Sequence, residues 1–228
     1  SATETGFNKR KHTLQGGPHL FVIGAQKCAT TSLHHLILSH PSICPSVKKE
    51  IHYFDRMDSW SKGAAYYLAH FKTRSAKCVA DRQPGFNGST TDDPNLHFVD
   101  ATPDYFTNPL VPARIFQSFP PKERSKKRFI LILREPVSRE FSWYNHRVRL
   151  CTKSMREHLK QRSRSRPGPV DVDKLCSDKH CAPLNCKEHA HKASLGKEIR
   201  GVSNFTDYYR SGGLVASRSL YMTHLRRW

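Results

Sequence analysis

The fold class of this chain follows from Phe21-Val22-Ile23-Gly24-Ala25-Gln26-Lys27-Cys28-Ala29-Thr30-Thr31-Ser32-Leu33. An apolar run ends at Gly24, and a lysine, a row of hydroxyl residues and an amphipathic stretch follow, which predicts a strand, a tight loop and a helix. The free N–H groups at the start of such a helix point to one place, where the helix dipole also favours an anion. Lys27 adds a positive charge there. The segment therefore predicts a cradle for a phosphate or sulfate group.

This loop differs from the one that binds nucleoside triphosphates. That motif requires G-x-x-x-x-G-K followed at once by Ser or Thr, whereas here Lys27 lies three residues after Gly24 and Ala29 precedes the hydroxyl residues. The arrangement G-x-x-K-x-x-T-T resembles the 5'-phosphosulfate loop of sulfotransferases that use 3'-phosphoadenosine 5'-phosphosulfate (PAPS). The resemblance implies that the following loop residues bind the cofactor: Lys27, Cys28, Ala29, Thr30, Thr31 and Ser32.

A second segment, Arg128–Tyr144, repeats the pattern of an apolar run that ends in charge and opens into a helix. It resembles the R-[DE]-P-x-x-R-x-x-S-x-Y pattern of carbohydrate sulfotransferases, through Arg134, Pro136, Arg139, Ser142 and Tyr144. The resemblance implies that Arg134 and Ser142 hold the 3'-phosphate of PAPS, a task that suits the planar fork of an arginine. A buried strand followed by a surface helix with an ordinary Arg–Glu pair is the alternative, but it does not explain the order of the two motifs.

Between these motifs lies a polar run followed by aromatic residues, Lys48–Asp55. It resembles the K-E-x-H-F-F-D region of the glycosaminoglycan sulfotransferases, in which the glutamate is the catalytic base. The resemblance implies that Glu50 accepts the proton of the acceptor hydroxyl, and His52 is the second candidate because its pKa suits proton transfer at neutral pH. The alternatives are a solvated carboxylate and a packed histidine. With Lys27 stabilising the leaving group, these residues are the candidate catalytic set, and no metal is expected.

A fourth segment, Phe98–Phe106, resembles the E-K-T-P-x-Y-F stretch that lines the acceptor cleft of the heparan sulfate 3-O-sulfotransferases. Ala101 stands where those enzymes have a lysine, so their acceptor cannot be carried over to this chain. In this respect the chain is closer to the N-acetylgalactosamine 4-sulfate 6-O-sulfotransferases. Heparan sulfate N-sulfotransferases also belong to the group that the chain resembles. The missing lysine favours an acceptor of the chondroitin type.

Charge is the unusual feature of the composition. The 228 residues carry 38 basic and 19 acidic side chains, a formal net charge of +19, which predicts attraction to polyanions. A sulfated polysaccharide, a nucleic acid or an anionic membrane surface would each satisfy it. No run approaches the roughly 20 apolar residues that span a bilayer. The resemblance implies a catalytic fragment of a type II membrane protein of the Golgi lumen, whose anchor lies outside this chain.

Seven cysteines are present. Cys28, Cys44 and Cys78 lie in or next to predicted elements, where a small packed thiol is the usual state. The remaining cysteines lie in a polar region that cross-links would stabilise, and at least one disulfide is expected among them in an oxidising lumen. They are Cys151, Cys176, Cys181 and Cys186. A zinc site is the alternative there, formed from Cys176, His180, Cys181, Cys186, His189 and His191. Asn87 and Asn204 begin formal glycosylation signals.

The order of predicted elements gives an α/β class, a three-layer P-loop-like fold with a central parallel sheet flanked by helices and the ligand at the carboxyl ends of the strands. Strands are predicted at 20–24, 77–80, 96–100 and 128–134. Helices are predicted at 31–39, 62–71, 109–119 and 137–150. Residues 1–17 read as a polar tail and 18–228 as one sulfotransferase domain, with a basic insertion at about 152–201. A further helix is expected within 219–228, and the C-terminal end reads as truncated.

Together these features predict a PAPS-dependent O-sulfotransferase that acts on a carbohydrate hydroxyl, with a glycosaminoglycan-like polysaccharide as its partner and acceptor. Nucleic acid is not expected. Two other classes stay open. One is a non-catalytic module that binds heparin or RNA through charge, and the other is a P-loop kinase of small molecules, which the missing G-K-[ST] disfavours.

Overall fold

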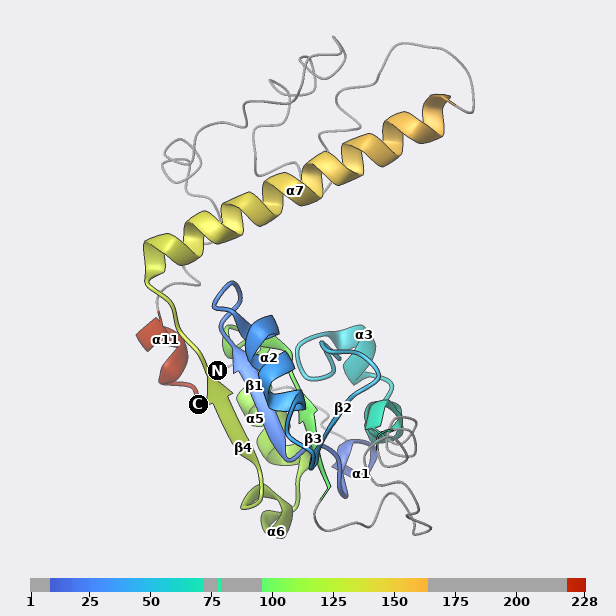
Figure 1. Ribbon diagram of the computed structural model, residues 1–228. Helices are drawn as coiled ribbons and strands as arrows, with labels where there is room; N and C mark the ends of the chain where they lie inside the picture. The colour runs from blue at the N-terminus through green and yellow to red at the C-terminus, as the bar shows by residue number, and fades with distance from the viewer. Residues whose placement is uncertain (1–8, 72–77, 79–95, 164–220) are drawn as a thin grey trace. The chain divides into compact units, whose positions relative to one another are not determined.

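The computed structural model describes residues 9–71, 78, 96–163 and 221–228 (Figure 1). The chain divides into two compact units, a first unit of Ser1–Leu133 with Tyr221–Trp228 and a second unit of Arg134–Leu220. Each is described by itself. The division falls inside the range 18–228 that the sequence predicts as one domain. Within the described ranges, no helix combines the length and the apolar character that crossing a membrane requires.

The first unit is built on a four-stranded parallel sheet with the order β2-β3-β1-β4 (Figure 1). Its strands are β1 (Leu20–Gly24), β2 (Ile43–Pro45), β3 (His97–Asp100) and β4 (Arg128–Leu131). Leu20 on β1 is paired with Val99 on β3 and with Arg128 on β4. Because all four strands run in one direction, the loops that follow them start from the same edge of the sheet.

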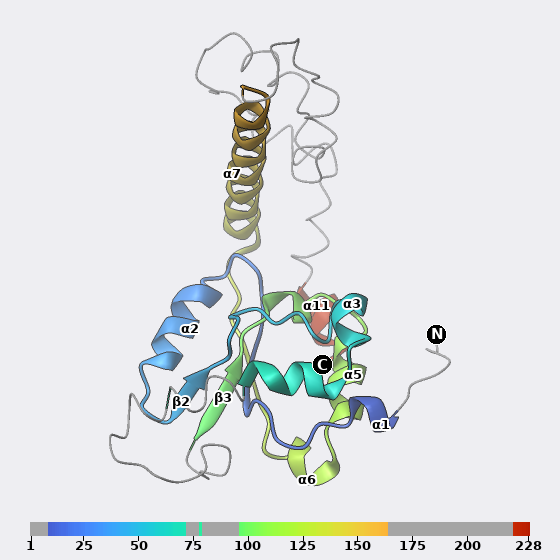
Figure 2. The ribbon, with the colours of Figure 1, turned by 90° about the vertical axis from the view of Figure 1, so that its right-hand side faces the viewer.

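Helices cover both faces of this sheet (Figure 2). The alternation of β1 assigns its side chains: Val22 packs with Leu33 and Ile37 of α2 (Thr30–Leu38) on one face. Phe21 and Ile23 pack on the other face into the main core, together with residues of α3, α5 and the helix at 64–71. The α/β class and the central parallel sheet flanked by helices are therefore confirmed. The bounds of these elements are α3 (Met57–Trp60) and α5 (Val111–Ser118).

Short elements complete the first unit: α1 (Lys9–His12), the 3₁₀ helix η1 (Pro103–Phe106), α6 (Pro121–Arg124) and α11 (Tyr221–Leu225). The second unit is described through one long helix, α7 (Pro136–Ser163). α7 continues well past Leu150, so the expected insertion at 152–201 begins within a helix. The prediction of a helix within 219–228 is confirmed by α11.

Two sequence-based assignments of strands differ from the structure. Cys78, the described residue of the strand predicted at 77–80, is helical, so that prediction is wrong. The residues of β2 were predicted to lie in a loop. A three-residue strand that ends in a proline is too short to show the alternation from which strands are recognised. β4 ends at Leu131 rather than Arg134. Strand β1, by contrast, has the predicted bounds.

The described part of the expected polar tail is packed. Leu14 is fully buried, and its N–H donates to the carbonyl of Ser118 at 2.8 Å. The His12 imidazole stacks on Trp60 with ring centroids 3.9 Å apart and lies 3.1 Å from the hydroxyl of Tyr53. Residues 9–17 therefore form part of the first unit, because one apolar residue and one aromatic contact fix a segment whose composition is polar.

The cysteines divide differently from the prediction. Cys44 and Cys78 form a disulfide with their Cα atoms 5.9 Å apart, so the expectation of packed thiols is wrong for this pair. Cys28 is free and buried, as expected. Cys151 is disulfide-bonded, in agreement with the bridge predicted for its region. The other predicted members of that region, the alternative zinc ligands and both glycosylation signals lie outside the described residues.

Candidate functional site

The loop between β1 and α2 contains two residues with an unusual backbone conformation. Lys27 and Ala29 both have left-handed backbone conformations, with φ of 66° and 64°. Such turns direct successive N–H groups to one side and create anion-binding concavities. Ala29 is the N-cap residue of α2, and no side chain caps this end of the helix. The helix start therefore offers donors to an anion, as the sequence predicts.

Packing and backbone bonds hold this loop. The Ala25 N–H donates to the Ile132 carbonyl at 2.8 Å, and the Ile132 N–H donates to the Gly24 carbonyl at 2.9 Å. A Cβ at Gly24 would lie 2.6 Å from the Cβ of Phe106, so η1 approaches too closely for any larger residue. Cys28 is 2% exposed, and its side chain points into the core. The Cys28 N–H donates to the Ala25 carbonyl at 3.2 Å, so Cys28 contributes to the form of the loop.

The hydroxyl residues of the loop are not equivalent. Thr30 is 5% exposed, whereas Thr31 and Ser32 are exposed on the first turn of α2. Lys27 is half-buried. Of the three predicted hydroxyl donors, Thr31 and Ser32 therefore remain accessible to a ligand, and Thr30 belongs to the packing of the helix.

Lys49 joins this loop to the predicted base. Its Nζ donates to the Thr31 hydroxyl at 3.0 Å and to Glu50 Oε1 at 2.9 Å. The carboxylate of Glu50 is thus brought beside the loop although the two segments are far apart in the sequence. The sequence predicted no role for Lys49, since a lysine in a polar run carries no signal for a specific contact. The structure makes it the bridge of the site.

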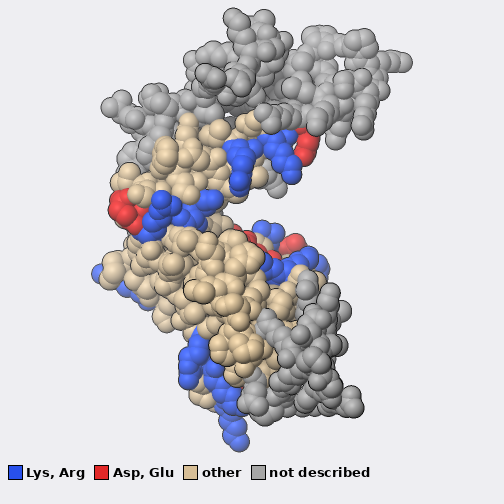
Figure 3. All heavy atoms as spheres, viewed as in Figure 1, with Lys and Arg blue, Asp and Glu red and all other residues tan. Residues whose placement is uncertain are grey.

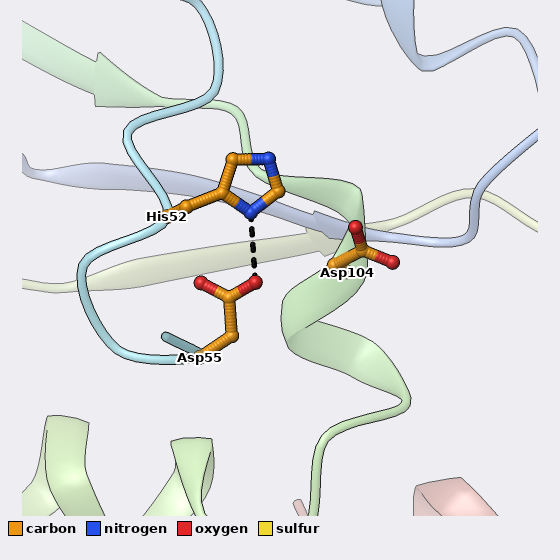
Figure 4. Close-up of side chains that lie close together, drawn as sticks. All are labelled: His52, Asp55 and Asp104. Carbon is orange, nitrogen blue, oxygen red and sulfur yellow. Dashed lines mark hydrogen bonds and ion pairs between the residues drawn. The ribbon is translucent and has the colours of Figure 1, made fainter. Parts of the chain in front are cut away.

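Glu50 and His52 are electrostatically coupled. His52 Nε2 lies 3.5 Å from Glu50 Oε2, and Nδ1 lies 2.7 Å from Asp55 Oδ2 (Figure 4). The hydrogen bond from His52 and the nearby Lys49 ammonium lower the pKa of Glu50 to about 2, against the opposing effect of burial. Burial disfavours the imidazolium, but the bonds to Asp55 and Glu50 outweigh it and raise the pKa of His52 to about 9. At neutral pH Glu50 is therefore ionised and can accept a proton, whereas His52 already carries one.

His52, Asp55 and Asp104 place one ligand atom each within 4.8 Å of one another, a spacing that raises the question of a metal. The 2.7 Å separation of His52 Nδ1 from Asp55 Oδ2 is that of a charge-assisted hydrogen bond. Figure 4 shows the second oxygen of Asp55 directed away from Asp104. The arrangement is that of an imidazolium held by carboxylates, which brings the positive charge of His52 beside Glu50.

The second predicted anion site lies in the second unit. Glu135 accepts hydrogen bonds from the N–H groups of Val137 at 2.8 Å and Ser138 at 2.7 Å, so it caps α7, and these bonds lower its pKa. Arg134 is exposed and Ser142 is half-buried, whereas Arg139 is buried in an ion pair with Glu140. Because Glu135 uses the first donors of the helix, a phosphate here would depend on the side chains of Arg134 and Ser142. Their partnership with the loop of the first unit stays a prediction.

Figure 3 shows cations over α6 and along α7, among other places. Near α6, Lys122, Lys126 and Arg128 are exposed. On α7, Arg149 and Lys153 are exposed, and Lys153 lies 3.8 Å from Glu157. Both surfaces agree with the polyanion attraction expected from the net charge.

The sequence of this chain is similar to those of several sulfotransferases. No family model matches the chain. It is 30% identical over 135 residues to the membrane-associated sulfotransferase kil1 of Dictyostelium discoideum, a match that covers 58% of this chain and 23% of that protein. It is 30% identical over 142 residues to the bifunctional heparan sulfate N-deacetylase/N-sulfotransferase 4 of Mus musculus, with 60% and 14% covered.

A third relative is the heparan sulfate glucosamine 3-O-sulfotransferase 5 of Homo sapiens, 25% identical over 187 residues, with 82% of this chain and 44% of that protein covered. The chain thus spans less than half the length of these curated relatives. A crystal structure of a sulfotransferase from Alicyclobacillus acidocaldarius aligns with 93% of this chain and 68% of that one, at a TM-score of 0.45 and 17% identity. The resemblance that the motifs indicated is confirmed by the curated relatives: the chain is related to the carbohydrate sulfotransferases.

Proposed function

We propose that the protein transfers a sulfuryl group from PAPS to a hydroxyl of a carbohydrate acceptor, a glycosaminoglycan-like polysaccharide. The contact of Lys49 with both Thr31 and Glu50 carries this proposal. It brings an ionised carboxylate next to an anion-binding loop, and transfer from a bound anionic donor to a hydroxyl needs that combination.

The residues of the loop fit the 5'-phosphosulfate of PAPS. The left-handed turns at Lys27 and Ala29 direct N–H groups to one side, α2 begins without a side-chain cap, and Thr31 and Ser32 are exposed beside them. PAPS, when bound, supplies the activated sulfuryl group. Lys27 and the loop N–H groups would neutralise the charge that collects on the phosphate as the sulfuryl group leaves, a preorganised electrostatic role. We also propose that Arg134 and Ser142 hold the 3'-phosphate.

Glu50 is the proposed base. Its carboxylate would take the proton of the acceptor hydroxyl while the acceptor oxygen bonds to sulfur and the bond from sulfur to the phosphate oxygen breaks. A pKa of about 2 keeps Glu50 ionised at every physiological pH. Lys49 lies between Glu50 and Thr31, so its ammonium group can stabilise negative charge on the base and then on the leaving phosphate. His52, protonated and bonded to Asp55, would orient Glu50 instead of acting as a base.

The class of acceptor rests on charge and on one substitution. The net charge of +19 suits a sulfated or carboxylated polysaccharide. Ala101 has no charged side chain and is fully buried, so this position supplies no cation toward an acceptor. We therefore place a chondroitin-type chain ahead of a heparan-type chain. A Golgi lumenal location, through an anchor outside this sequence, belongs to the same proposal.

Transfer of radiolabelled sulfate tests this function. The protein is incubated with labelled PAPS and a panel of desulfated and partly sulfated chondroitin, dermatan and heparan chains, and label in polysaccharide is measured. Incorporation into at least one chain is expected, with the chondroitin type preferred. Retention on heparin without label transfer and without a PAPS-dependent thermal shift would instead indicate a polyanion-binding module, and binding of ATP with magnesium would indicate a kinase.

A further inference from the structure

A buried carboxylate lies beneath the loop that carries Glu50. Asp100, the last residue of β3, is fully buried. Its Oδ1 accepts a hydrogen bond from the Thr102 hydroxyl at 2.7 Å, and its Oδ2 accepts from the hydroxyls of Tyr67 at 2.8 Å and Tyr105 at 2.9 Å. All of these side chains are also fully buried. The network joins β3, η1 and the helix at 64–71 around one charge.

Two of these hydroxyls also bind the loop of the base. Thr102 Oγ1 accepts from the N–H groups of Ile51 at 3.1 Å and His52 at 3.5 Å, and the Tyr105 hydroxyl accepts from the N–H of Tyr53 at 3.2 Å. An ionised carboxylate can only accept, so both hydroxyls must give their protons to Asp100 and present lone pairs to the loop. The Ala101 N–H adds a bond to the Lys49 carbonyl at 3.3 Å. The backbone is thereby held on both sides of Glu50.

We propose that Asp100 is the positioning residue of the catalytic base: it orients Thr102 and Tyr105, and these fix the backbone at 51–53, so that the Glu50 carboxylate stays beside Lys49 and the phosphosulfate loop. This inference rests on the proposed function, since it concerns the same base. His52 has a left-handed backbone conformation, with φ of 55°, which an unsupported loop would not keep.

The charge of Asp100 argues against a purely structural role. Burial raises the pKa of Asp100 to about 6, although the hydroxyl bonds from Thr102, Tyr67 and Tyr105 oppose the shift. Because this pKa lies above the ordinary value of 3.8, protonation favours the folded state, and ionisation at neutral pH lowers the stability of the fold. The protonated carboxyl would thus serve stability better than the ionised one. The ionised form is the one that fixes the direction of both hydroxyls.

Two tyrosines provide a matched test. Tyr67 and Tyr105 donate to the same oxygen of Asp100 over nearly equal distances, but only Tyr105 accepts from a loop N–H. Tyr105→Phe should lower kcat for sulfate transfer on the order of 30-fold, since a small displacement of a base is costly. Tyr67→Phe should lower it by less than about 3-fold. The Kd for adenosine 3',5'-bisphosphate, measured by calorimetry, should stay within about 2-fold of the unmodified protein in both, because the loop of β1 is untouched.

Thr102 and Asp100 sharpen the test. Thr102→Val removes the acceptor for two loop N–H groups and should lower kcat as Tyr105→Phe does, whereas Thr102→Ser keeps the hydroxyl and should restore most of it. Asp100→Asn should lower kcat while the melting temperature stays equal or rises. Equal losses of kcat in the two tyrosine variants, or no rescue by serine, would overturn the proposal.

A second measurement separates this proposal from the function. If the unmodified protein transfers sulfate to no acceptor, the proposed function fails, and NMR still tests the positioning. Tyr105→Phe should speed hydrogen exchange at the Tyr53 amide and lower the pKa of His52 from about 9 toward its ordinary 6.5, as the loop loses its register. Tyr67→Phe should change neither. An unchanged His52 titration in Tyr105→Phe would show that Asp100 does not position the loop.

Discussion

Two loops at the same edge of the sheet are held in opposite ways. The loop after β1 is shaped by its own backbone, through left-handed turns at Lys27 and Ala29 and the close packing of Gly24 on Phe106. The loop after β2 is shaped by side chains from elsewhere, through Thr102 and Tyr105 and the carboxylate of Asp100. The first offers rigid backbone donors, and the second holds a carboxylate in place.

The difference explains why the sequence predicts the form of one loop and not what holds the other. A loop whose form depends on its own residues needs a glycine and small residues at fixed spacing, so it leaves a motif. In the loop after β2 a motif indicates Glu50, but the hydroxyls that hold the loop, those of Thr102 and Tyr105, lie about 50 residues further along the chain. Lys49 connects the two loops, and the predictions below test each of them.

The largest effect is expected from the backbone-shaped loop. Under the proposed function, Lys27→Ala should lower kcat/KM for sulfate transfer on the order of 10⁴-fold, because it removes a charge that would bind the donor and stabilise the leaving phosphate. Calorimetry with adenosine 3',5'-bisphosphate should show weaker binding as well. Lys48→Ala, which removes an exposed lysine of the same charge, is the control and should change either value by less than about 2-fold.

The loop held from outside should show a different loss. Glu50→Gln should lower kcat on the order of 10³-fold, since the amide cannot accept the acceptor proton, while the Kd for adenosine 3',5'-bisphosphate stays nearly unchanged. Asp58→Asn, at an exposed carboxylate, serves as the control. An equal loss of cofactor affinity in Lys27→Ala and Glu50→Gln would contradict the division of roles between the two loops.

The stability that the loop after β2 gives to the fold should also depend on pH. The pKa of His52 is raised to about 9 from an ordinary 6.5, so its ion pairs stabilise the fold fully below pH 6.5, and this stability is lost as pH rises through 9. Urea unfolding at pH 6 and pH 9.5 should reveal a difference on the order of 3 kcal/mol. In His52→Gln most of this difference should disappear. An equal change in the free energy of unfolding between the two pH values in both proteins would show that His52 does not form these ion pairs.

The smallest effects concern the backbone of the first loop. Gly24→Ala should lower the free energy of unfolding by about 2 kcal/mol, because its Cβ would overlap that of Phe106. Ala29→Gly should raise it by about 1 kcal/mol, since Ala29 has a φ of 64° and a glycine adopts that value without strain. Urea unfolding measures both. A neutral Gly24→Ala would mean that η1 yields, and that packing does not set the form of this loop.

Much of the fold was predictable because it depends on local pattern. The apolar run of β1 with its glycine, and the amphipathic stretches of α2 and α5, give elements close to the predicted bounds. The candidate loop and Glu50 were found through motifs. β2 was missed because three residues carry no periodicity, and the helical Cys78 was assigned to a strand because the small apolar residues Val79 and Ala80 follow it.

The sequence by itself determined the class of the fold, the candidate anion-binding loop and the likeness to carbohydrate sulfotransferases, since each depends on residues that are neighbours along the chain. Only the tertiary structure decided that Lys49 bridges Thr31 and Glu50, that Cys44 pairs with Cys78, and that Asp100 supports the loop of the base. These contacts join segments that are distant in the chain. Burial and geometry give such residues their roles, and neither quantity can be read from the order of amino acids.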